Sequence, residues 1–546
     1  MALAQTLVAK TNVANGSANG ILSVLIKDMD MPRMPASSGI AIVTGVVVLF
    51  LITSMLATPK VNAQEPPLLK PTVPFFGHLV SLLQHQAKYH VILGRKTGKS
   101  IATLPMLNGK MYAVWDPALI ASGLRNKNLS TTPQAVAGTQ SLCQIRDETA
   151  AIFCGPDKTA QVAEHMLLHI IPMSLAGAHL QQINEVAVKK LAVDLSSLQA
   201  ESVPNVWLWF RRMLTLPTTK ALYGDEDPFA KDWGLEEVLW TFEANLPKLI
   251  ANFYPAVTAS TGHRARAALG DALGRYYAAR HDSSPSASEF VRARAQYFRD
   301  YGIADDEIAR IEIILPFTAM VNTVPALFWL FCFVFSRPAL LARVREEVEL
   351  LTTRDGDEVI ILLNALEERA PLLSSCYKET LRLTNHQVST RTVIEDTTIS
   401  DNKGNTYLLR KDNVVQMSIA ASHRTEQFWG PDFDDFSPER FLDSANRKTD
   451  DGPGSQKAIR AAFLPYGGGQ HYCPGKGFAY AEMMAAMTAL LLGFDVEPHG
   501  GEWKVPEWAT WSLVDAVTKP KGKGEGFGIE VKRREGWEGV KWRYEL

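Results

Sequence analysis

Apolar residues recur every three to four positions through most of the chain, which is the spacing of helices with one buried face. This period predicts helices over 159–200, 206–223, 235–253, 261–280, Leu372 to Leu383 and 476–493, and a longer, more apolar one over Asp305 to Phe335. Strand-like segments are few and do not alternate with the helices, which argues against a doubly wound sheet. The predicted fold class is mainly α with a small β-rich region.

The strands are predicted in two stretches of the chain. Residues 101–115 suggest a hairpin around Asn108 and Gly109, because Asn-Gly favours a tight turn between strands. Residues 388–417 have a strand-like pattern, with turn residues from Asp401 to Gly404. We therefore expect small strand regions near each end of the globular part.

One segment near the N-terminus is long and apolar enough to cross a membrane. No residue between Arg33 and Lys60 is charged, and the run from Gly39 to Ala57 is close to the roughly 20 residues that span a hydrocarbon core. A cleaved signal peptide would place a shorter apolar stretch nearer the start. A buried core helix is a weaker alternative, because the run stands apart from the rest of the chain. We predict a permanent transmembrane anchor.

The anchor divides the chain into four parts. A leader of residues 1–38 precedes the anchor at 39–57, and residues 58–74 contain five prolines that predict a semi-rigid hinge. Residues 75–546 then form one globular domain. Lysines and arginines flank the anchor evenly, so the charge pattern leaves its orientation open.

Composition narrows the function classes. The formal net charge is -2, and basic residues cluster only locally, so a nucleic-acid partner is not expected. The five cysteines are odd in number and form no CxxC pair, which argues against a disulfide framework or a zinc site. Cys143, Cys154, Cys332 and Cys376 are interpreted as packing residues. His165 and His169 have the spacing of a metal-binding pair, but no third ligand is in view.

The fifth cysteine, Cys473, lies in the glycine-rich loop FLPYGGGQHYCPGK. Its three consecutive glycines allow the backbone to approach a flat ligand closely. A helix is predicted to begin after Gly475, so its positive end would face the sulfur. These surroundings favour a thiolate, which is the form of cysteine that binds metals. A buried cysteine beside a turn is the alternative that the loop by itself leaves open.

This loop resembles the haem-binding signature of the cytochrome P450 family, in which an aromatic residue, a glycine, a basic residue, the cysteine and a second glycine have fixed spacing. The matching positions are Tyr466, Gly469, His471, Cys473 and Gly475. Tyr466 stands for the usual phenylalanine and His471 for the usual arginine. The resemblance implies that Cys473 is the axial ligand of the haem iron, that His471 reaches a propionate, and that Tyr466, Gly467, Gly469 and Gly475 also contact the haem.

Two further motifs occur upstream in the order that the family requires. Glu379 and Arg382 form a Glu-x-x-Arg pair on one helix face, which alone would suggest an ordinary surface ion pair. The segment from Pro438 to Phe441 resembles the family's Pro-Glu-Arg-Phe. The resemblance implies that Arg440 joins Glu379 and Arg382 in a buried network that braces the cysteine loop, a role that suits the planar fork of arginine.

The contacts to the haem propionates are only partly assigned. The resemblance implies that Arg391, at the start of the second strand region, forms a salt bridge with one propionate. Many family members use a Trp-x-x-x-Arg pair for the other. Trp207 and Arg211 have this spacing but come later in the chain than expected, so the second partner is unassigned.

The long apolar helix carries the residues that the resemblance assigns to oxygen activation. Thr323 matches the family's proton-relaying alcohol, whereas Asn322 replaces the usual acid and Met320 the usual glycine. Asparagine cannot release a proton near neutral pH, so water would have to carry the relay. Pro325 removes an N–H donor and predicts a kink. The catalytic candidates are Thr323 and Asn322.

The Asn-Thr-x-Pro-Ala-x-Phe-Trp string is similar to the branch that holds sterol 7-hydroxylases and prostacyclin synthase. The resemblance implies a helical prism that binds haem b and uses O2 to hydroxylate or epoxidise a lipophilic small molecule such as a sterol, a terpenoid or another secondary metabolite. Electrons would come from NADPH through NADPH-cytochrome P450 reductase. The expected location is a single-pass membrane protein of the endoplasmic reticulum with its catalytic domain facing the cytosol.

Two other functions stay open from the sequence. One is a peroxide isomerase or dehydratase of the prostacyclin-synthase type, which would need no reductase. The other is a haem-binding sensor or carrier without catalysis. Thr323 favours the hydroxylase over both.

Overall fold

The structure is a computed structural model that describes residues 59–71, 76–107, 109–155, 161–442 and 456–546. The predicted leader and the predicted anchor at 39–57 lie outside these residues. Within the described part, Asp305–Phe335 is the helical stretch long and apolar enough to cross a membrane, and 78% of its most apolar window is buried inside the protein. That stretch is therefore the core of the globule.

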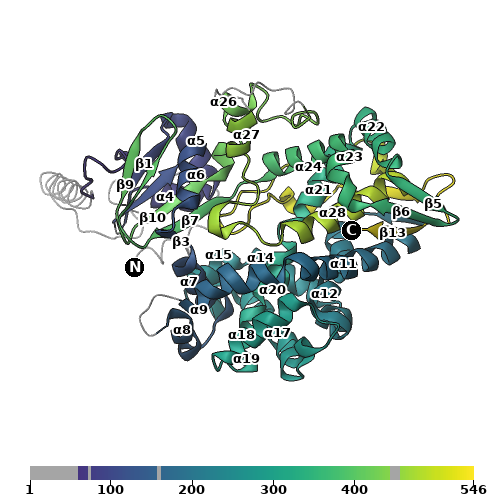
Figure 1. Cartoon of the computed structure of the whole chain (residues 1–546), viewed down its shortest axis with the longest axis horizontal. Coiled ribbons are helices and arrows are strands. Elements are labelled where there is room, and N and C mark those ends of the chain that lie inside the picture. Colours follow the sequence, from purple (N-terminus) through teal and green to yellow (C-terminus); the bar gives the residue numbers. More distant parts are fainter. Residues whose placement is uncertain (1–58, 72–75, 108, 156–160, 443–455) are drawn as a thin grey trace, which may run out of the picture.

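A five-stranded sheet forms one end of the molecule (Figure 1). Its strands, in spatial order, are β1 (Ile101–Met106), β2 (Gly109–Val114), β10 (Val414–Ser418), β7 (Val388–Val393) and β3 (Leu129–Ser130). Strands β2 and β10 are parallel and the other neighbours are antiparallel. The separate hairpin of β8 (Thr397–Ser400) and β9 (Thr406–Leu409) and the helices α4 (Leu79–His85), α5 (Lys88–Thr97) and α6 (Pro117–Arg125) lie beside this sheet.

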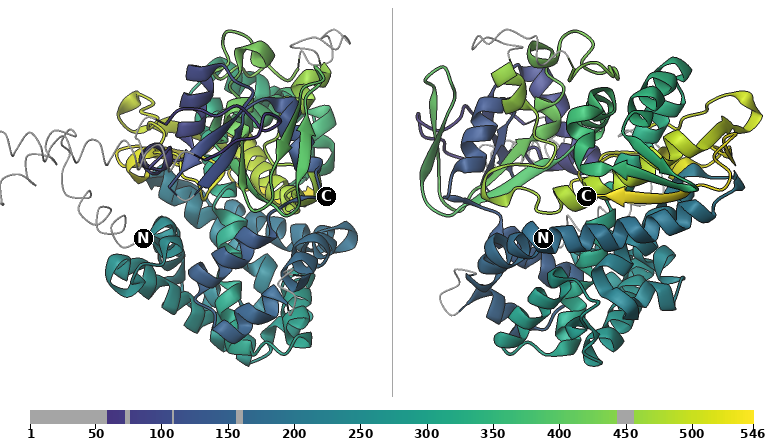
Figure 2. Two further views of the ribbon diagram at one scale, coloured as in Figure 1. Left: turned by 90° about the vertical axis from the view of Figure 1, so that its left-hand side faces the viewer. Right: turned by 45° about the vertical axis from the view of Figure 1, so that its right-hand side comes forward.

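Two small sheets lie at the other end, where the C-terminus returns (Figure 2). One contains β11 (Phe494–Pro498), β12 (Ile529–Arg533) and β4 (Ala200–Val203), and the other contains β13 (Lys541–Glu545), β6 (Glu358–Leu362) and β5 (Thr352–Asp355).

Helices make up the rest of the globule. In the first half of the chain they are α7 (Thr132–Cys143), α8 (Asp147–Cys154), α9 (Gln161–His165), a π-helix (Met166–Ile170), α10 (Ile171–Ser174), α11 (Gly177–Ser197), α12 (Val206–Tyr223), α13 (Pro228–Lys231), α14 (Leu235–Ala244), α15 (Leu246–Ala251), α16 (Pro255–Thr258) and α17 (Ser260–Ala278). In the second half they are α18 (Glu289–Asp300), α19 (Asp305–Glu312), α20 (Ile314–Met320), α21 (Thr323–Phe335), α22 (Pro338–Glu349), α23 (Leu366–Arg369), α24 (Pro371–Thr384), α25 (Ile419–Ser422), α26 (Glu426–Trp429), α27 (Gln456–Ala462) and α28 (Lys476–Gly493).

Helix α21 is the centre of the packing. Almost all of its side chains are buried, and it contacts α12, α24 and α28. Helix α28 is also buried along most of its length and packs against α11 and α22. Such all-round burial explains why these two segments show a continuous apolar pattern rather than one polar face.

The sequence-based elements agree well with these bounds. The mainly helical fold with small sheets is confirmed, α12 and α28 have the predicted limits, and the hairpin at 101–115 and the strands within 388–417 are present. The cysteines of the described residues form no disulfide, and Cys143, Cys332 and Cys376 are buried as predicted. Three predicted helices differ, because each is divided into shorter ones. The segment 159–200 forms α9, the π-helix, α10 and α11, the segment 235–253 forms α14 and α15, and the long central helix forms α19, α20 and α21.

Candidate functional site

Cys473 lies in the turn that leads into α28. Its backbone N–H donates to the carbonyl of Tyr466 at 3.1 Å, which closes the loop. The N–H groups of Gly475 and Lys476, at the start of α28, donate to its sulfur. Burial raises the pKa of the Cys473 thiol above its ordinary value, while these two N–H groups act in the opposite direction. The side chain is nevertheless exposed, so the sulfur can reach a ligand.

The backbone conformation of the loop requires glycine at two positions. Gly467 and Gly469 have φ values of 70° and 67°, in the left-handed region that favours glycine. A Cβ atom on Gly469 would lie 1.7 Å from the carbonyl oxygen of Leu124 at the end of α6. The loop therefore packs directly on α6. Gly475 has ordinary backbone angles, and a Cβ there would come 3.9 Å from the sulfur.

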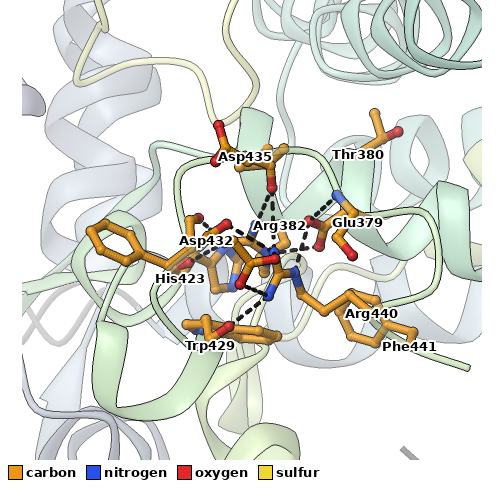
Figure 3. A network of polar contacts seen from close by, with 12 residues as sticks. Glu379, Thr380, Arg382, His423, Trp429, Asp432, Asp435, Arg440 and Phe441 are labelled. Atoms are coloured by element: carbon orange, nitrogen blue, oxygen red, sulfur yellow. Dashed lines mark hydrogen bonds and ion pairs between the residues drawn. The ribbon is translucent and has the colours of Figure 1, made fainter. Parts of the chain in front are cut away.

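Behind the loop, Glu379 and Arg382 on α24 form a fully buried ion pair (Figure 3). Arg382 donates Nε and Nη2 to the two carboxylate oxygens at 2.7 and 2.8 Å. Its other N–H groups reach the carbonyls of His423, Phe433 and Asp435. All five donors of this guanidinium are used, which makes the group a rigid anchor for three backbone carbonyls.

Arg440 completes the network from the opposite side. Its Nε donates to Glu379 Oε1 at 2.9 Å, and its remaining groups reach Asp432 and the carbonyl of Trp429. The two arginines therefore share one buried carboxylate (Figure 3). A buried carboxylate with two guanidinium partners keeps its charge compensated away from water.

Side chains that the sequence analysis did not identify connect this network to the cysteine loop. The backbone N–H of Leu464 donates to Nε2 of His423, whose carbonyl receives Arg382. Asn385 donates to the carbonyl of Pro465 at 2.9 Å, and the hydroxyl of Tyr377 bonds that of Tyr466. No local pattern marks His423 or Asn385 as important, because their partners lie about 41 and 80 positions away.

Arg391 and His471 lie near each other at the edge of the loop. The Arg391 side chain is 5% exposed, and within the described part of the chain it donates only to the carbonyl of Thr390. Burial lowers the pKa of Arg391 to about 10. Burial, together with the charge of Arg391, also lowers the pKa of His471 to about 4, so His471 is neutral at pH 7. Either ring nitrogen of His471 lies within hydrogen-bond distance of the Thr131 hydroxyl.

These groups fit a haem. An accessible thiol at a helix N-terminus suits an iron ligand. Arg391 has no carboxylate partner among the described residues, and a buried cation gains most from an anion such as a propionate. His471 could donate one hydrogen bond to the same group as a neutral ring.

Two other sequence candidates lie elsewhere. Arg211 is buried between Glu236 and Glu237, with its guanidinium 4.9 Å from the ring of Trp240, so its charge is already opposed. The ring centroids of His165 and His169 lie 4.8 Å apart with the rings tilted, and the described residues contain no group of three or more metal ligands.

The central helix is interrupted where Asn322 and Thr323 lie. Pro325 is in the first turn of α21, and the break falls at Val321 and Asn322, where a proline ring would clash with the carbonyl four residues back. The predicted kink is thus confirmed. The Thr323 hydroxyl donates to the carbonyl of Ala319 at 2.9 Å.

Asn322 has a structural use that the sequence analysis did not foresee. Its carboxamide oxygen accepts the backbone N–H groups of Ala516 and Val517 at 2.9 and 3.1 Å. The N–H of His386 in turn donates to the carbonyl of Ala516. Asn322 therefore fixes the segment around Ala516 against the broken helix, in addition to any contribution to proton transfer.

The comparisons with known proteins agree with this geometry. The profile of the family described as Cytochrome P450 matches residues 229–523. A cytochrome P450 monooxygenase of Gibberella zeae is 35% identical over 492 residues, which cover 89% of this chain and 92% of the relative. The cytochrome P450 monooxygenase nodJ of Hypoxylon pulicicidum is 27% identical over 497 residues, with 89% and 93% covered. Cytochrome P450 7A1 of Sus scrofa is 29% identical over 271 residues, about half of each chain.

Proposed function

The chain belongs to the cytochrome P450 family and is an oxidoreductase, and from this premise we propose that it is a membrane-anchored haem-thiolate monooxygenase of a lipophilic small molecule. The observation that carries the proposal is the Cys473 thiol, which is exposed at the start of α28 and receives two backbone N–H groups. Bound haem would supply oxygen activation through its thiolate-ligated iron.

The protein's own residues then have distinct tasks. Cys473 would hold the iron, while Arg391 and His471 would hold the propionates. Glu379, Arg382 and Arg440 would keep the cysteine loop in place through the hydrogen bonds described above. Thr323, whose hydroxyl oxygen can still accept a hydrogen bond, would stabilise a water that carries protons to the oxygen site, with Asn322 beside it.

The substrate class is proposed as a sterol, a terpenoid or another secondary metabolite. Support comes from the similarity to a fungal monooxygenase and to cytochrome P450 7A1. We further propose that residues 39–57 anchor the protein in the endoplasmic reticulum membrane and that NADPH-cytochrome P450 reductase delivers the electrons.

The experiment is metabolite profiling of a strain that lacks this chain, followed by feeding the accumulated compound to microsomes with NADPH and ¹⁸O₂. We expect the compound to gain one labelled oxygen atom only when the reductase and NADPH are present. Turnover of a hydroperoxide without reductase would instead show a peroxide isomerase. No turnover with a complete haem spectrum would show a haem-binding protein without catalysis.

A further inference from the structure

A cavity of about 410 Å³ lies beside the segment that Asn322 holds. Its walls come from α12, α14, the loop after α24 and residues 509–523. Eight of the 17 lining residues are apolar, including Trp207, Trp240, Leu246, Pro247 and Val514, and eight are polar or charged. Concave sites lined by aromatic groups with a few polar ones are typical of small-molecule binding.

A chain of four ionisable side chains forms the polar part of this wall. The ammonium of Lys519 bonds the carboxylates of Glu243 on α14 and Asp515. The second oxygen of Asp515 bonds Nε2 of His386 at 2.8 Å. These residues are largely buried, with side chains between 1% and 19% exposed. These hydrogen bonds and ion pairs therefore link α14 to residues 515–519 and to the loop after α24.

The charges of this wall compensate each other within the protein. Burial alone would lower the pKa of Lys519, but the charges of Asp515 and Glu243 outweigh it and raise that pKa. Burial likewise opposes the ionisation of Asp515, but the hydrogen bond from His386 and the charge of Lys519 lower its pKa to about 2. Lys519 and Asp515 are thus both charged at neutral pH.

One N–H group of Lys519 has no acceptor among the described residues. A lysine ammonium has three N–H groups, and among the described residues Lys519 uses two of them, on Glu243 and Asp515. The side chain lines the cavity and is 19% exposed. The third N–H can therefore donate to a molecule inside the cavity.

The surrounding charges decide what kind of acceptor fits. Two carboxylates face the single ammonium of Lys519, and Arg211 nearby is likewise held by Glu236 and Glu237. A ligand carboxylate beside Lys519 would meet these negative groups and gain little. The ammonium of Lys523 also lines the cavity, but this side chain is exposed to water, where an ion pair contributes little. A neutral carbonyl or hydroxyl oxygen avoids the repulsion and still accepts a charge-assisted hydrogen bond.

We propose that this cavity is a substrate subsite in which Lys519 determines specificity, by donating its free N–H to an oxygen of a neutral polycyclic lipophile. The tryptophans and aliphatic side chains contact the apolar skeleton. The inference rests on the proposed function and refines its substrate class. Asn322 holds Ala516 and Val517, which lie between Asp515 and Lys519 in the sequence. A substrate oxygen bonded to Lys519 would therefore be held at a fixed position relative to the central helix.

The test compares three ligands on the purified haem-containing enzyme. The probes are 5α-androstan-3-one, which has a neutral acceptor, 5α-androstane, which has none, and 5α-androstane-3-carboxylic acid, which is an anion at neutral pH. The Soret shift on titration gives each Kd. We expect the ketone to bind about tenfold to a hundredfold more tightly than the hydrocarbon and the acid, because a hydrogen bond from a charged donor is gained.

The variant is Lys519→Met combined with Glu243→Leu, in which neither new side chain has a hydrogen-bond donor and Glu243 is not left as an unpaired buried charge. We expect it to bind the ketone and the hydrocarbon with equal Kd. The matched control is Lys521→Met on the same segment, because Lys521 pairs with Glu507 at the exposed surface and its loss should leave the tenfold or larger preference unchanged.

Two results would overturn the subsite. One is an unchanged preference for the ketone in the double variant, and the other is the absence of any Soret shift with all three probes. Both are read only in preparations whose reduced carbon monoxide complex shows the red-shifted Soret band. Absence of that band in the wild-type enzyme would count against the proposed function instead, so the two failures are distinguishable.

Discussion

The brace behind the cysteine loop, formed by Glu379, Arg382 and Arg440, and the wall of the cavity around Lys519 both contain buried charges. The two regions differ in whether all hydrogen-bond donors of the cation are paired within the protein. In the brace, Arg382 donates all five of its N–H groups to Glu379 and to backbone carbonyls, and the side chains of Arg382 and Glu379 are fully buried. In the wall, Lys519 keeps one donor free and remains partly exposed. A network in which every donor is paired can hold the cysteine loop in place, whereas a network with an unpaired donor can also bind a ligand. The predictions below test this distinction in order of expected size.

The largest effect is expected in the brace. Glu379→Ala would leave Arg382 and Arg440 buried without their shared carboxylate. Breaking a buried ion pair from one side costs about 3–5 kcal/mol, so we expect little folded protein and loss of bound haem. The measurement is the yield of haem-containing protein together with its thermal midpoint. Normal yield and stability would show that the brace is dispensable.

A buried carboxyl group on α28, outside both regions, separates the effect of burial from that of pairing. Glu482 on α28 is fully buried, and among the described residues its carboxyl group accepts a hydrogen bond only from the Thr218 hydroxyl, at 2.7 Å. Burial, opposed in part by that bond, raises the pKa of Glu482 to about 8 from an ordinary 4.5. The folded state therefore holds a proton that the unfolded chain releases, and stability falls as pH rises from 4.5 to 8.

Glu482→Gln removes this titration. We expect the variant to be more stable than the wild type by about 3 kcal/mol at pH 7, since each pKa unit corresponds to about 1.4 kcal/mol. The gain should shrink to about 1 kcal/mol at pH 5 and vanish only below pH 4.5, where the unfolded chain is also largely protonated. Thermal midpoints of the two proteins at pH 5, 7 and 8 give the result. A difference that does not depend on pH would contradict the assignment.

Asn322 tests the link between the central helix and the cavity wall. Asn322→Leu leaves the N–H groups of Ala516 and Val517 without an acceptor, at a cost of about 1–3 kcal/mol. We expect faster amide hydrogen exchange in the peptide that contains these residues, measured by mass spectrometry. Asn322→Asp is the matched control, because it retains an acceptor oxygen, and its exchange should stay close to the wild type. Equal protection in all three proteins would argue against the link.

The smallest effect is expected one residue away from the brace. Glu439 precedes Arg440 in sequence, but it pairs with Arg343 at the surface, where the two side chains are 40% and 52% exposed. Surface pairs contribute about 0–1 kcal/mol, so Glu439→Ala should leave the thermal midpoint nearly unchanged. A loss comparable with that of Glu379→Ala would show that position along the chain, rather than burial and pairing, decides the effect.

The same two regions show what the sequence can predict. The brace could be anticipated because Glu379 and Arg382 are three residues apart on one helix and Arg440 lies in a recognisable segment. The cavity wall could not, because Glu243, His386 and Lys519 are far apart in the chain and belong to no local pattern. Their association depends on how α14 and the loop after α24 pack against residues 515–519.

The helices were predictable for a related reason. The apolar residues of α12 and α28 left a clear signal, and the limits of both helices follow from the sequence. The break before α21 was foreseen from Pro325, but the hydrogen bonds of Asn322 were not, because their donors are backbone groups almost 200 residues away. Side-chain roles that depend on distant backbone leave no trace in composition or spacing.

The measurement that tests the central claim most directly is the carbon monoxide spectrum of the reduced protein. With the Cys473 sulfur bound to the iron, the haem-containing wild type should show a strongly red-shifted Soret band. Cys473→Ser should retain a folded chain, judged by its far-ultraviolet circular dichroism, but lose that band. A folded wild-type protein that binds haem without the red-shifted band, or a Cys473→Ser variant that keeps it, would contradict the account.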